Sequence, residues 1–283
     1  MKLRKLLGLQ AEVGDNLKRY SNEFEVICFH DVEELSGFLV ESKQKDRNEF
    51  KKGLLIAATD ETIALGKQYG IAAMAYMNLE IPNQTYSGVD MIVEGFEEID
   101  ANFLEKVYQR YHGIPWTIAE TDRCIIRELS LEDLDALFEL YADEEMIRFT
   151  ENLYPYEEEQ EFQSAYINNM YRFYGYGMWL IFSKETDELI GRAGLEHREY
   201  NGEIELELGY LIGRKYQKQG YATEVCQKIL RIAKSMTDFS RINCLIDAEN
   251  VSSARLAEKL HFTHTEDMEL DGRKMERYIL MLD

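Results

Sequence analysis

A short loop in the carboxyl-terminal half of the chain has the residues of an anion-binding site. Gln217, Gly220 and Ala222 follow the spacing Q-x-x-G-x-A between a predicted strand and a predicted helix. Gly220 lacks a Cβ, so a ligand can come close to the backbone there. The first N–H groups of a helix have no intrahelical acceptor, and with the helix dipole they attract negative charge. The loop is therefore predicted to bind an anionic group.

The strand that leads into this loop, residues 203–212, alternates acidic and apolar side chains. Its apolar residues Ile204, Leu206 and Leu208 are predicted to share one buried face. The carboxylates predicted on the other face are Glu203, Glu205 and Glu207. A carboxylate there that is partly buried beside aromatic groups would have its pKa raised towards neutrality, which suits a general base. The apolar residues of the helix that follows the loop include Val225, Ile229 and Ala233.

Two blocks of the sequence resemble the GNAT N-acetyltransferases. Residues 217–222, with the flanking strand and helix, are similar to the acetyl-CoA pyrophosphate loop of that family, Q/R-x-x-G-x-G/A. The block Asn250–Phe262 is similar to N-x-x-S-x-x-x-x-E-K-L-G-F, found in the subgroup that acetylates N-terminal amines of ribosomal proteins. His261 replaces the glycine of that pattern. The resemblance implies an acetyltransferase domain over residues 117–283, with an α/β (α+β) fold around a mixed central sheet.

The resemblance implies acetyl-CoA as the co-substrate, bound without a metal. Backbone N–H groups of residues 217–222 would hold the pyrophosphate, and the pantetheine arm would run along residues 203–212 with Asn250 bonded to it. Lys215 and Lys218 either assist the phosphates or are simply solvated. The residues implied at the cofactor site are Leu208, Tyr210, Leu211, Ile212, Gln217, Lys218, Gln219, Gly220, Tyr221, Ala222, Thr223, Asn250 and Ser253.

The resemblance also implies the catalytic groups, for direct attack of an amine without an acyl-enzyme. Glu207 matches the acidic residue, two positions before Gly-Tyr, that many relatives use as the base; Glu205 is the alternate if a bulge turns the strand. Many relatives have a tyrosine seven residues after the asparagine, where this chain has Ala257, so Ser253 is the candidate proton donor to the thiolate. The simpler alternatives are a solvated strand face for the glutamates and a hydroxyl bonded to its own helix for Ser253.

Periodicity and turn residues predict the other elements of residues 117–283. The expected strands are 124–127, 176–182, 189–197, 241–247 and 274–280, and the expected helices are 131–141, about 157–173, and 252–260. Two turns are expected, at Asn201-Gly202 and Asp271-Gly272. The aromatic residues expected to line the mouth of the acceptor site are Tyr154, Tyr156 and Tyr174.

Residues 1–116 alternate strands and helices, which predicts a small doubly wound (Rossmann-like) α/β domain. The expected strands are 24–29, 53–59, 71–77 and 89–93, and the expected helices are 32–40, 60–69 and 101–111. Residues 1–20 have a mixed helical pattern, and Gly113–Trp116 is expected to be the linker.

Residues 54–111 also resemble the second half of a haloacid-dehalogenase-like phosphatase domain, through Asp60, Ala64 and Gly70-Ile71. That family has D-x-D after its first strand, whereas only His30-Asp31 follow the strand at 24–29. One carboxylate cannot be both nucleophile and acid/base, nor hold magnesium alone. We therefore expect a degenerate domain kept for structure, for acceptor capture or for dimerisation, so that the chain could form a homodimer.

Composition excludes several classes of protein. A net charge of −21 over 283 residues argues against nucleic acid as a partner. The acid excess is larger in residues 119–283, where it serves either solubility or attraction of a cationic amine acceptor. No apolar run reaches membrane-spanning length, and four scattered cysteines favour neither a zinc site nor disulfides, which fits a cytoplasmic protein without a membrane partner.

Three functions are consistent with these patterns. The first is an N-acetyltransferase that acts on a primary amine, either a peptide N-terminus or a small cationic amine. The second is a non-catalytic protein that binds or senses acetyl-CoA, which would require both Glu207 and Glu205 to point away from the ligand. The third is a two-domain acyl-processing protein, which the missing D-x-D motif disfavours.

Overall fold

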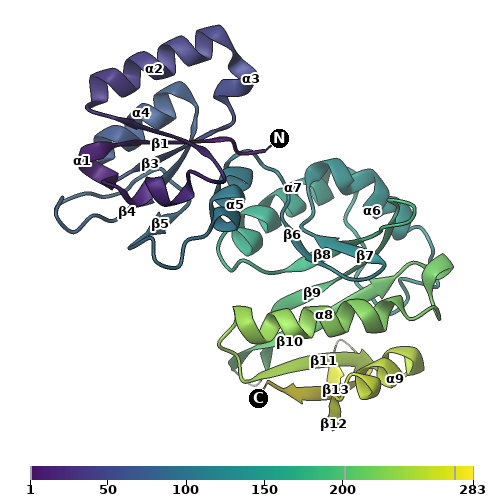
Figure 1. The fold of residues 1–283 in the computed structure, drawn as a ribbon. Coiled ribbons are helices and arrows are strands. Elements are labelled where there is room, and N and C mark those ends of the chain that lie inside the picture. Colours follow the sequence, from purple (N-terminus) through teal and green to yellow (C-terminus); the bar gives the residue numbers. More distant parts are fainter. Residues whose placement is uncertain (1, 201, 271, 283) are drawn as a thin grey trace. The chain divides into compact units, whose positions relative to one another are not determined.

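The computed structural model describes residues 2–200, 202–270 and 272–282, and it divides the chain into two compact units, residues 1–116 and 117–283 (Figure 1). Each unit has its own sheet. Asn201 and Asp271, on which the two predicted turns fall, lie outside the described residues. Among the residues described, no helix is long and apolar enough to cross a membrane.

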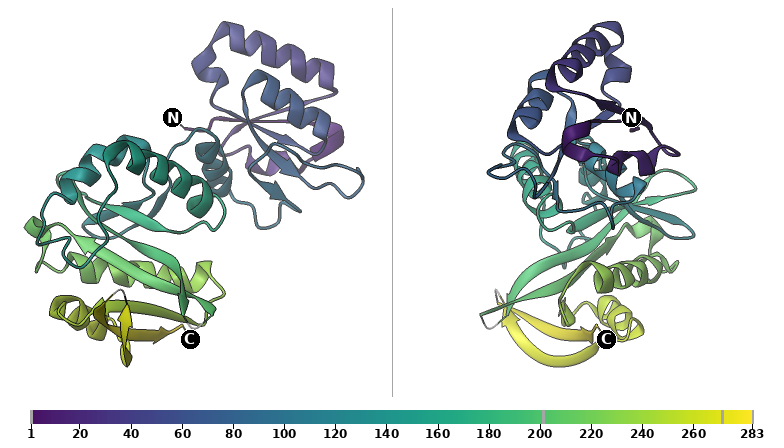
Figure 2. Two further views of the ribbon diagram at one scale, coloured as in Figure 1. Left: turned by 180° about the vertical axis from the view of Figure 1, so that it is seen from behind. Right: turned by 60° about the vertical axis from the view of Figure 1, so that its left-hand side comes forward.

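The amino-terminal unit contains a parallel five-stranded sheet in the order β2-β1-β3-β4-β5. Its strands are β1 Lys5–Leu9, β2 Glu25–Phe29, β3 Gly53–Ala57, β4 Ala72–Tyr76 and β5 Ile92–Val93. Its helices are α1 Gln10–Val13, α2 Val32–Lys45, α3 Arg47–Phe50, α4 Asp60–Tyr69, α5 Ala101–Tyr111 and the 3-10 helix η1 Asn16–Tyr20. One core packs α2 and α4 on the sheet and another packs α5 on its opposite face, so the predicted doubly wound α/β arrangement is confirmed (Figures 1 and 2).

The helical prediction for residues 1–20 is wrong at residues 5–9, because β1 lies there, inside the sheet between β2 and β3. Leu6 and Leu7 are buried on opposite faces, one under each layer of helices. A strand buried on both faces shows no alternation, and the spacing of Leu3, Leu6 and Leu7 imitates that of a helix.

The carboxyl-terminal unit contains an eight-stranded mixed sheet in the order β12-β13-β11-β10-β9-β8-β7-β6 (Figure 1). Its strands are β6 Thr117–Glu120, β7 Cys124–Arg127, β8 Met178–Ser183, β9 Leu189–Tyr200, β10 Glu203–Ile212, β11 Arg241–Asp247, β12 Thr263–Leu270 and β13 Arg273–Met281. Its helices are α6 Leu134–Leu140, α7 Tyr156–Tyr166, α8 Tyr221–Met236 and α9 Val251–Lys259, with short turns η2 Leu131–Asp133, η3 Ile167–Tyr171 and η4 Arg214–Tyr216. This confirms the predicted fold class.

Two details of this unit differ from the predictions. The closing strand is half of a hairpin, since β12 precedes β13 and forms the edge of the sheet (Figure 2). The side chains of β12 are almost all exposed, so no alternation marks it in the sequence. The second helix stays α-helical only to Tyr166 and then continues as the π-helical turn η3.

Strands β10 and β11 are parallel neighbours that pair at only two positions, Leu206 with Ile242 and Glu207 with Asn243. On its other side β10 pairs with β9 along its whole length. Beyond Glu207, the edge of β10 that faces β11 therefore has no ladder partner within the described ranges. Backbone groups on such an edge are left to side chains, water or a ligand.

Candidate active site

The predicted anion loop ends at the amino terminus of α8. Gly220 is the residue before the helix and has φ of 86° and ψ of 0°, a left-handed conformation that other residues adopt only with strain. The first hydrogen bond of the helix runs from Glu224 N to Gly220 O, at 3.1 Å. The N–H groups of Tyr221, Ala222 and Thr223 thus have no intrahelical acceptor. This geometry fits a pyrophosphate, and Gly220 could not be replaced without cost.

Arg123 stabilises the loop, although the sequence analysis did not identify it. Its guanidinium donates to the carbonyl oxygen of Gln219 at 3.1 Å and to the carboxylate of Glu224 at 2.7 Å. It also lies over the ring of Tyr221, 4.0 Å from the centroid. Arg123 and Glu224 are 101 residues apart, so no local spacing could have indicated this contact.

The other polar side chains of the loop either stabilise its conformation or remain available for a phosphate. Gln217 Nε2 donates to the carbonyl oxygen of Ile212 at 2.9 Å, which folds the loop back on the end of β10. Lys215 pairs with Glu188 at 3.1 Å, whereas the exposed Lys218 has no ion pair with any residue that the structure describes. Lys218 also has a positive φ of 58°. Of the two lysines, Lys218 is the better placed for a phosphate.

The predicted cofactor residues of β10 lie along its unpaired edge. Leu208, Leu211 and Ile212 are buried, and Tyr210 is half-buried. The hydroxyl of Tyr210 donates to the carbonyl oxygen of Ser253 at 3.1 Å, which links β10 to the start of α9. The structure thus brings the β10 residues next to the second sequence block.

The second block begins α9. Asn250 is the N-cap, and its Oδ1 accepts from Ser253 N at 3.2 Å and from the Ser252 hydroxyl at 2.9 Å. That oxygen is therefore bonded within the helix, which leaves the side-chain NH2 group of Asn250 for a ligand. Ser253 Oγ has no hydrogen-bond partner among the described residues, unlike the simpler alternative in which it bonds its own helix. His261 has φ of 69°, so it takes up the left-handed helix end that a glycine would occupy.

Glu207 lies where β10 and β11 separate, with 15% of its side chain exposed. Its Oε2 accepts from the Tyr200 hydroxyl at 2.5 Å and pairs with Arg198 Nε at 2.8 Å. Glu196 is opposite it on β9 and accepts from the Tyr166 hydroxyl at 2.9 Å. Burial raises the pKa of Glu207 above its ordinary value, although Arg198 and Tyr200 act in the opposite direction.

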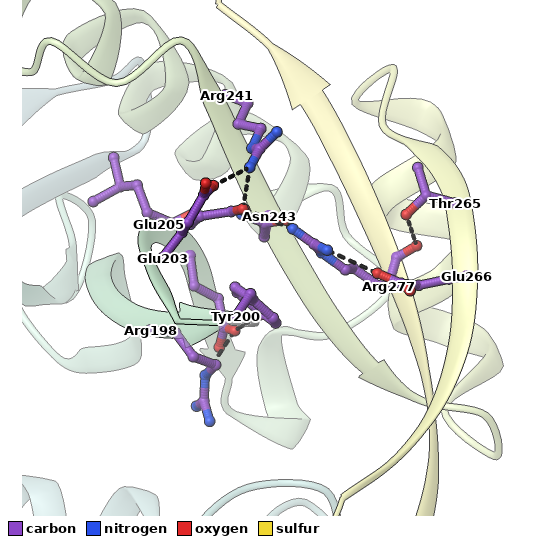
Figure 3. Close-up of polar contacts among 11 residues, drawn as sticks. Arg198, Tyr200, Glu203, Glu205, Arg241, Asn243, Thr265, Glu266 and Arg277 are labelled. Atoms are coloured by element: carbon purple, nitrogen blue, oxygen red, sulfur yellow. Dashed lines mark hydrogen bonds and ion pairs between the residues drawn. The ribbon is translucent and has the colours of Figure 1, made fainter.

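Glu205 has different surroundings, and the expectation that it lies on a solvated face is wrong. It is only 5% exposed, whereas Ile204, expected to be buried, is 61% exposed. The Glu205 carboxylate accepts from Arg241, from Asn243 at 2.5 Å and from Arg277 at 2.6 Å (Figure 3). Burial alone would raise its pKa, but these hydrogen bonds outweigh burial and lower it. Glu205 is thus occupied by cations, which opposes its role as the alternate base.

The three tyrosines proposed for the acceptor mouth are exposed and have different contacts. Tyr154 contacts Phe162 of α7. Tyr156 stacks on Phe138 and donates to Asp135 at 2.9 Å. Tyr174 contacts His197, which alternates with Glu196 along β9 and so lies on the opposite face of the sheet from Glu207. Tyr166 of α7, which was not predicted, reaches the Glu207 side of the sheet through Glu196.

Comparison with known proteins identifies the family. The model of the acetyltransferase (GNAT) domain family matches residues 123–263. The uncharacterized N-acetyltransferase p20 of Bacillus licheniformis is 30% identical over 145 residues, which are 50% of this chain and 80% of p20. The uncharacterized N-acetyltransferase YoaA of Bacillus subtilis strain 168 is 31% identical over 152 residues, 51% of this chain and 82% of YoaA. The chain belongs to the GNAT acetyltransferases, which use acetyl-CoA as co-substrate.

Solved structures share the fold. The apo form of RimL, a ribosomal L7/L12 alpha-N-protein acetyltransferase, matches with a TM-score of 0.51 and 20% identity, covering 59% of this chain and 94% of that one. RimL in complex with coenzyme A matches with a TM-score of 0.50 and 20% identity, covering 58% and 97%. At this level of identity the likeness concerns the fold alone.

Proposed function

We propose that this protein transfers the acetyl group of acetyl-CoA to a primary amine, with Glu207 as the general base. The observation that carries the proposal is the position of Glu207: a mostly buried carboxylate with a raised pKa, at the point where β10 and β11 separate. A raised pKa brings a carboxylate closer to the operating pH, where a base is most effective.

The residues of the cofactor site have separate tasks. The free N–H groups at the start of α8, with Gly220 ahead of them, would hold the pyrophosphate. The unpaired edge of β10 from Leu208 to Ile212, with the Asn250 amide, would hold the amides of the pantetheine arm. Bound acetyl-CoA supplies a thioester whose C–S bond breaks as the C–N bond to the amine forms, and coenzyme A leaves as a thiolate.

The protein would move two protons. An amine with a pKa well above neutrality arrives as ammonium, so Glu207 must take one proton before the nitrogen lone pair can attack. The departing thiolate needs a proton, and the Ser253 hydroxyl, without a partner in the described structure, is our candidate donor. As the C–N bond forms, the nitrogen loses a second proton, which restores the proton of Ser253. Over one cycle the proton held by Glu207 passes to solvent, and the products are an amide and a free thiol.

We propose a peptide N-terminus or a small cationic amine as the acceptor. The block Asn250–Phe262 resembles that of ribosomal-protein N-terminal acetyltransferases, and the net charge of −21 favours a cation. Residues 1–116 and 117–283 would be separate domains, with the first serving acceptor capture or dimerisation rather than phosphate chemistry. Its Asp60 carboxylate is occupied by the backbone N–H groups of Thr85 and Tyr86, at 2.9 and 2.7 Å.

Thiol release from acetyl-CoA tests the proposal. The acceptors are a short peptide with a free N-terminal serine, spermidine, and the same peptide with a blocked N-terminus. We expect release, and an acetylated product by mass spectrometry, with at least one free amine and none with the blocked peptide. If coenzyme A binds in calorimetry but no amine in a broad panel is acetylated, the protein is instead an acetyl-CoA binding or sensing protein.

A further inference from the structure

The two polar partners of Glu207 contact the same carboxylate oxygen. Tyr200 Oη and Arg198 Nε both approach Oε2, at 2.5 and 2.8 Å. Oε1 accepts no hydrogen bond from any residue that the structure describes. A carboxylate fixed through one oxygen keeps the lone pairs of the other for a proton.

Tyr200 is itself held in place by Arg277. Tyr200 is 6% exposed, and the guanidinium of Arg277 lies over its ring, 4.3 Å from the ring centroid. Arg277 donates to Glu205 at 2.6 Å, to Glu266 at 2.7 Å and to Asn243 at 2.9 Å, so its position is fixed by three strands (Figure 3). A planar guanidinium clamped in this way and stacked on a ring restricts where the phenol can lie.

We propose that Tyr200 is a positioning residue for Glu207: it fixes Oε2, together with Arg198, so that Oε1 is presented to the acceptor ammonium, and Arg277 in turn fixes Tyr200. The inference rests on the proposed function, because it names the atom of Glu207 that takes the proton. It also gives the buried cluster around Glu205 a role, since that cluster holds Arg277 against the Tyr200 ring.

The arrangement has a pH signature of known sign. Glu207 faces Arg198, Tyr200 and Glu196 on β9 and Asn243 on β11, while Tyr166 of α7 bonds Glu196. Cys244 of β11 lies on the other face of the sheet and interacts with Glu207 only electrostatically. The Tyr200 hydroxyl donates to the ionised carboxylate and so lowers its pKa. Removing that hydroxyl raises the pKa of Glu207 further, and since the base must be ionised, the acid limb of turnover moves to higher pH.

Tyr200→Phe, with Tyr278→Phe as the matched control, tests the inference. Tyr278 is also buried and donates to a glutamate, Glu276, at 2.8 Å, but it pairs with Cys244 and so lies on the other face of the sheet. The first measurement needs no acceptor: full-length protein with ¹³C-labelled glutamate carboxyls is titrated by NMR, and the Glu207 signal is assigned by its loss in Glu207→Gln. We expect an upward shift of the Glu207 midpoint in Tyr200→Phe and no shift in Tyr278→Phe.

The second measurement is a double-mutant cycle on thiol release with the best amine of the panel. Tyr200→Phe should lower turnover roughly tenfold at pH values below the shifted midpoint, the worth of one charged hydrogen bond. It should have no further effect in the Glu207→Gln background, because it acts through that residue. An unmoved midpoint, or an additive cycle, overturns the role of Tyr200. If Glu207→Gln turns over normally while the midpoint of Glu207 still shifts, the proposed base is overturned instead.

Discussion

Glu205 and Glu207 are two residues apart on one strand and on one face of it, yet their surroundings differ. Glu205 accepts from two arginines and an asparagine, and Glu207 from one arginine and one tyrosine, both on a single oxygen. The pKa of Glu205 is lowered and that of Glu207 is raised. Burial alone therefore does not make a carboxylate basic, because the number of fixed cations around it decides the direction.

The largest expected effect is the loss of coenzyme A binding, without which neither glutamate can take part in the reaction. Gly220→Asp should abolish coenzyme A binding in calorimetry while the fold survives. Any side chain is strained at φ of 86°, and a carboxylate would repel the pyrophosphate. Wild-type affinity in this variant would contradict the loop assignment.

The next effect separates the two glutamates by activity. Glu207→Gln should lower turnover by roughly 10²–10⁴, the worth of a positioned general base, and leave coenzyme A binding intact. The acid limb of the pH profile should also flatten, because glutamine does not titrate. A loss of less than about threefold with the limb preserved would show that the acceptor is deprotonated by another route.

The two glutamates should rank in the opposite order in their effect on stability, with Glu205→Gln destabilising the protein more than Glu207→Gln. Glu205→Gln leaves the buried Arg277 with only the half-exposed Glu266 as counter-charge, and should lower the free energy of unfolding by about 3 kcal/mol. Glu207→Gln should not lower the free energy of unfolding. The pKa of Glu207 is raised in the folded protein, so its charge destabilises the fold at pH values above the pKa of the unfolded chain. Glu266→Gln is the control and should cost under about 1 kcal/mol.

Because the pKa of Glu205 is lowered, its contribution is present above the unfolded pKa of about 4.3 and is lost as the pH falls through the folded value. Thermal unfolding of wild type and Glu205→Gln should therefore converge in acid. Equal melting temperatures of these two proteins at neutral pH would mean that the ion pairs merely offset their own desolvation.

The smallest effect concerns the acceptor. If the acid excess attracts a cationic amine, the apparent KM for spermidine should rise with salt, because the screening length falls to about 10 Å at 0.1 M. An uncharged-side-chain peptide is the control and should show a weaker dependence. A salt-insensitive KM for spermidine would leave the charge with a role in solubility only.

The sequence predicted what depends on neighbouring residues. The bounds of α5, the strand Glu203–Ile212 and the start of a helix at Tyr221 follow from periodicity and Gly220, and the fold class follows from the order of such elements. It could not predict that the acidic face of β10 is covered. Glu205 is covered by Arg241 and Arg277, which are 36 and 72 positions further along the chain. Arg123, 101 positions before Glu224, was missed for the same reason.

We expect the brief pairing of β10 with β11 to let the two sides of the sheet open separately. Strands β11, β13 and β12 are joined to the remainder of the sheet by two ladder positions, whereas β9 and β10 are joined along ten. Amide hydrogens on the two sides should therefore exchange with solvent at different free energies of opening. The ion pairs from Glu205 to Arg241 and Arg277 connect β10 to β11 and β13. They therefore hold together two parts of the sheet that could otherwise open independently.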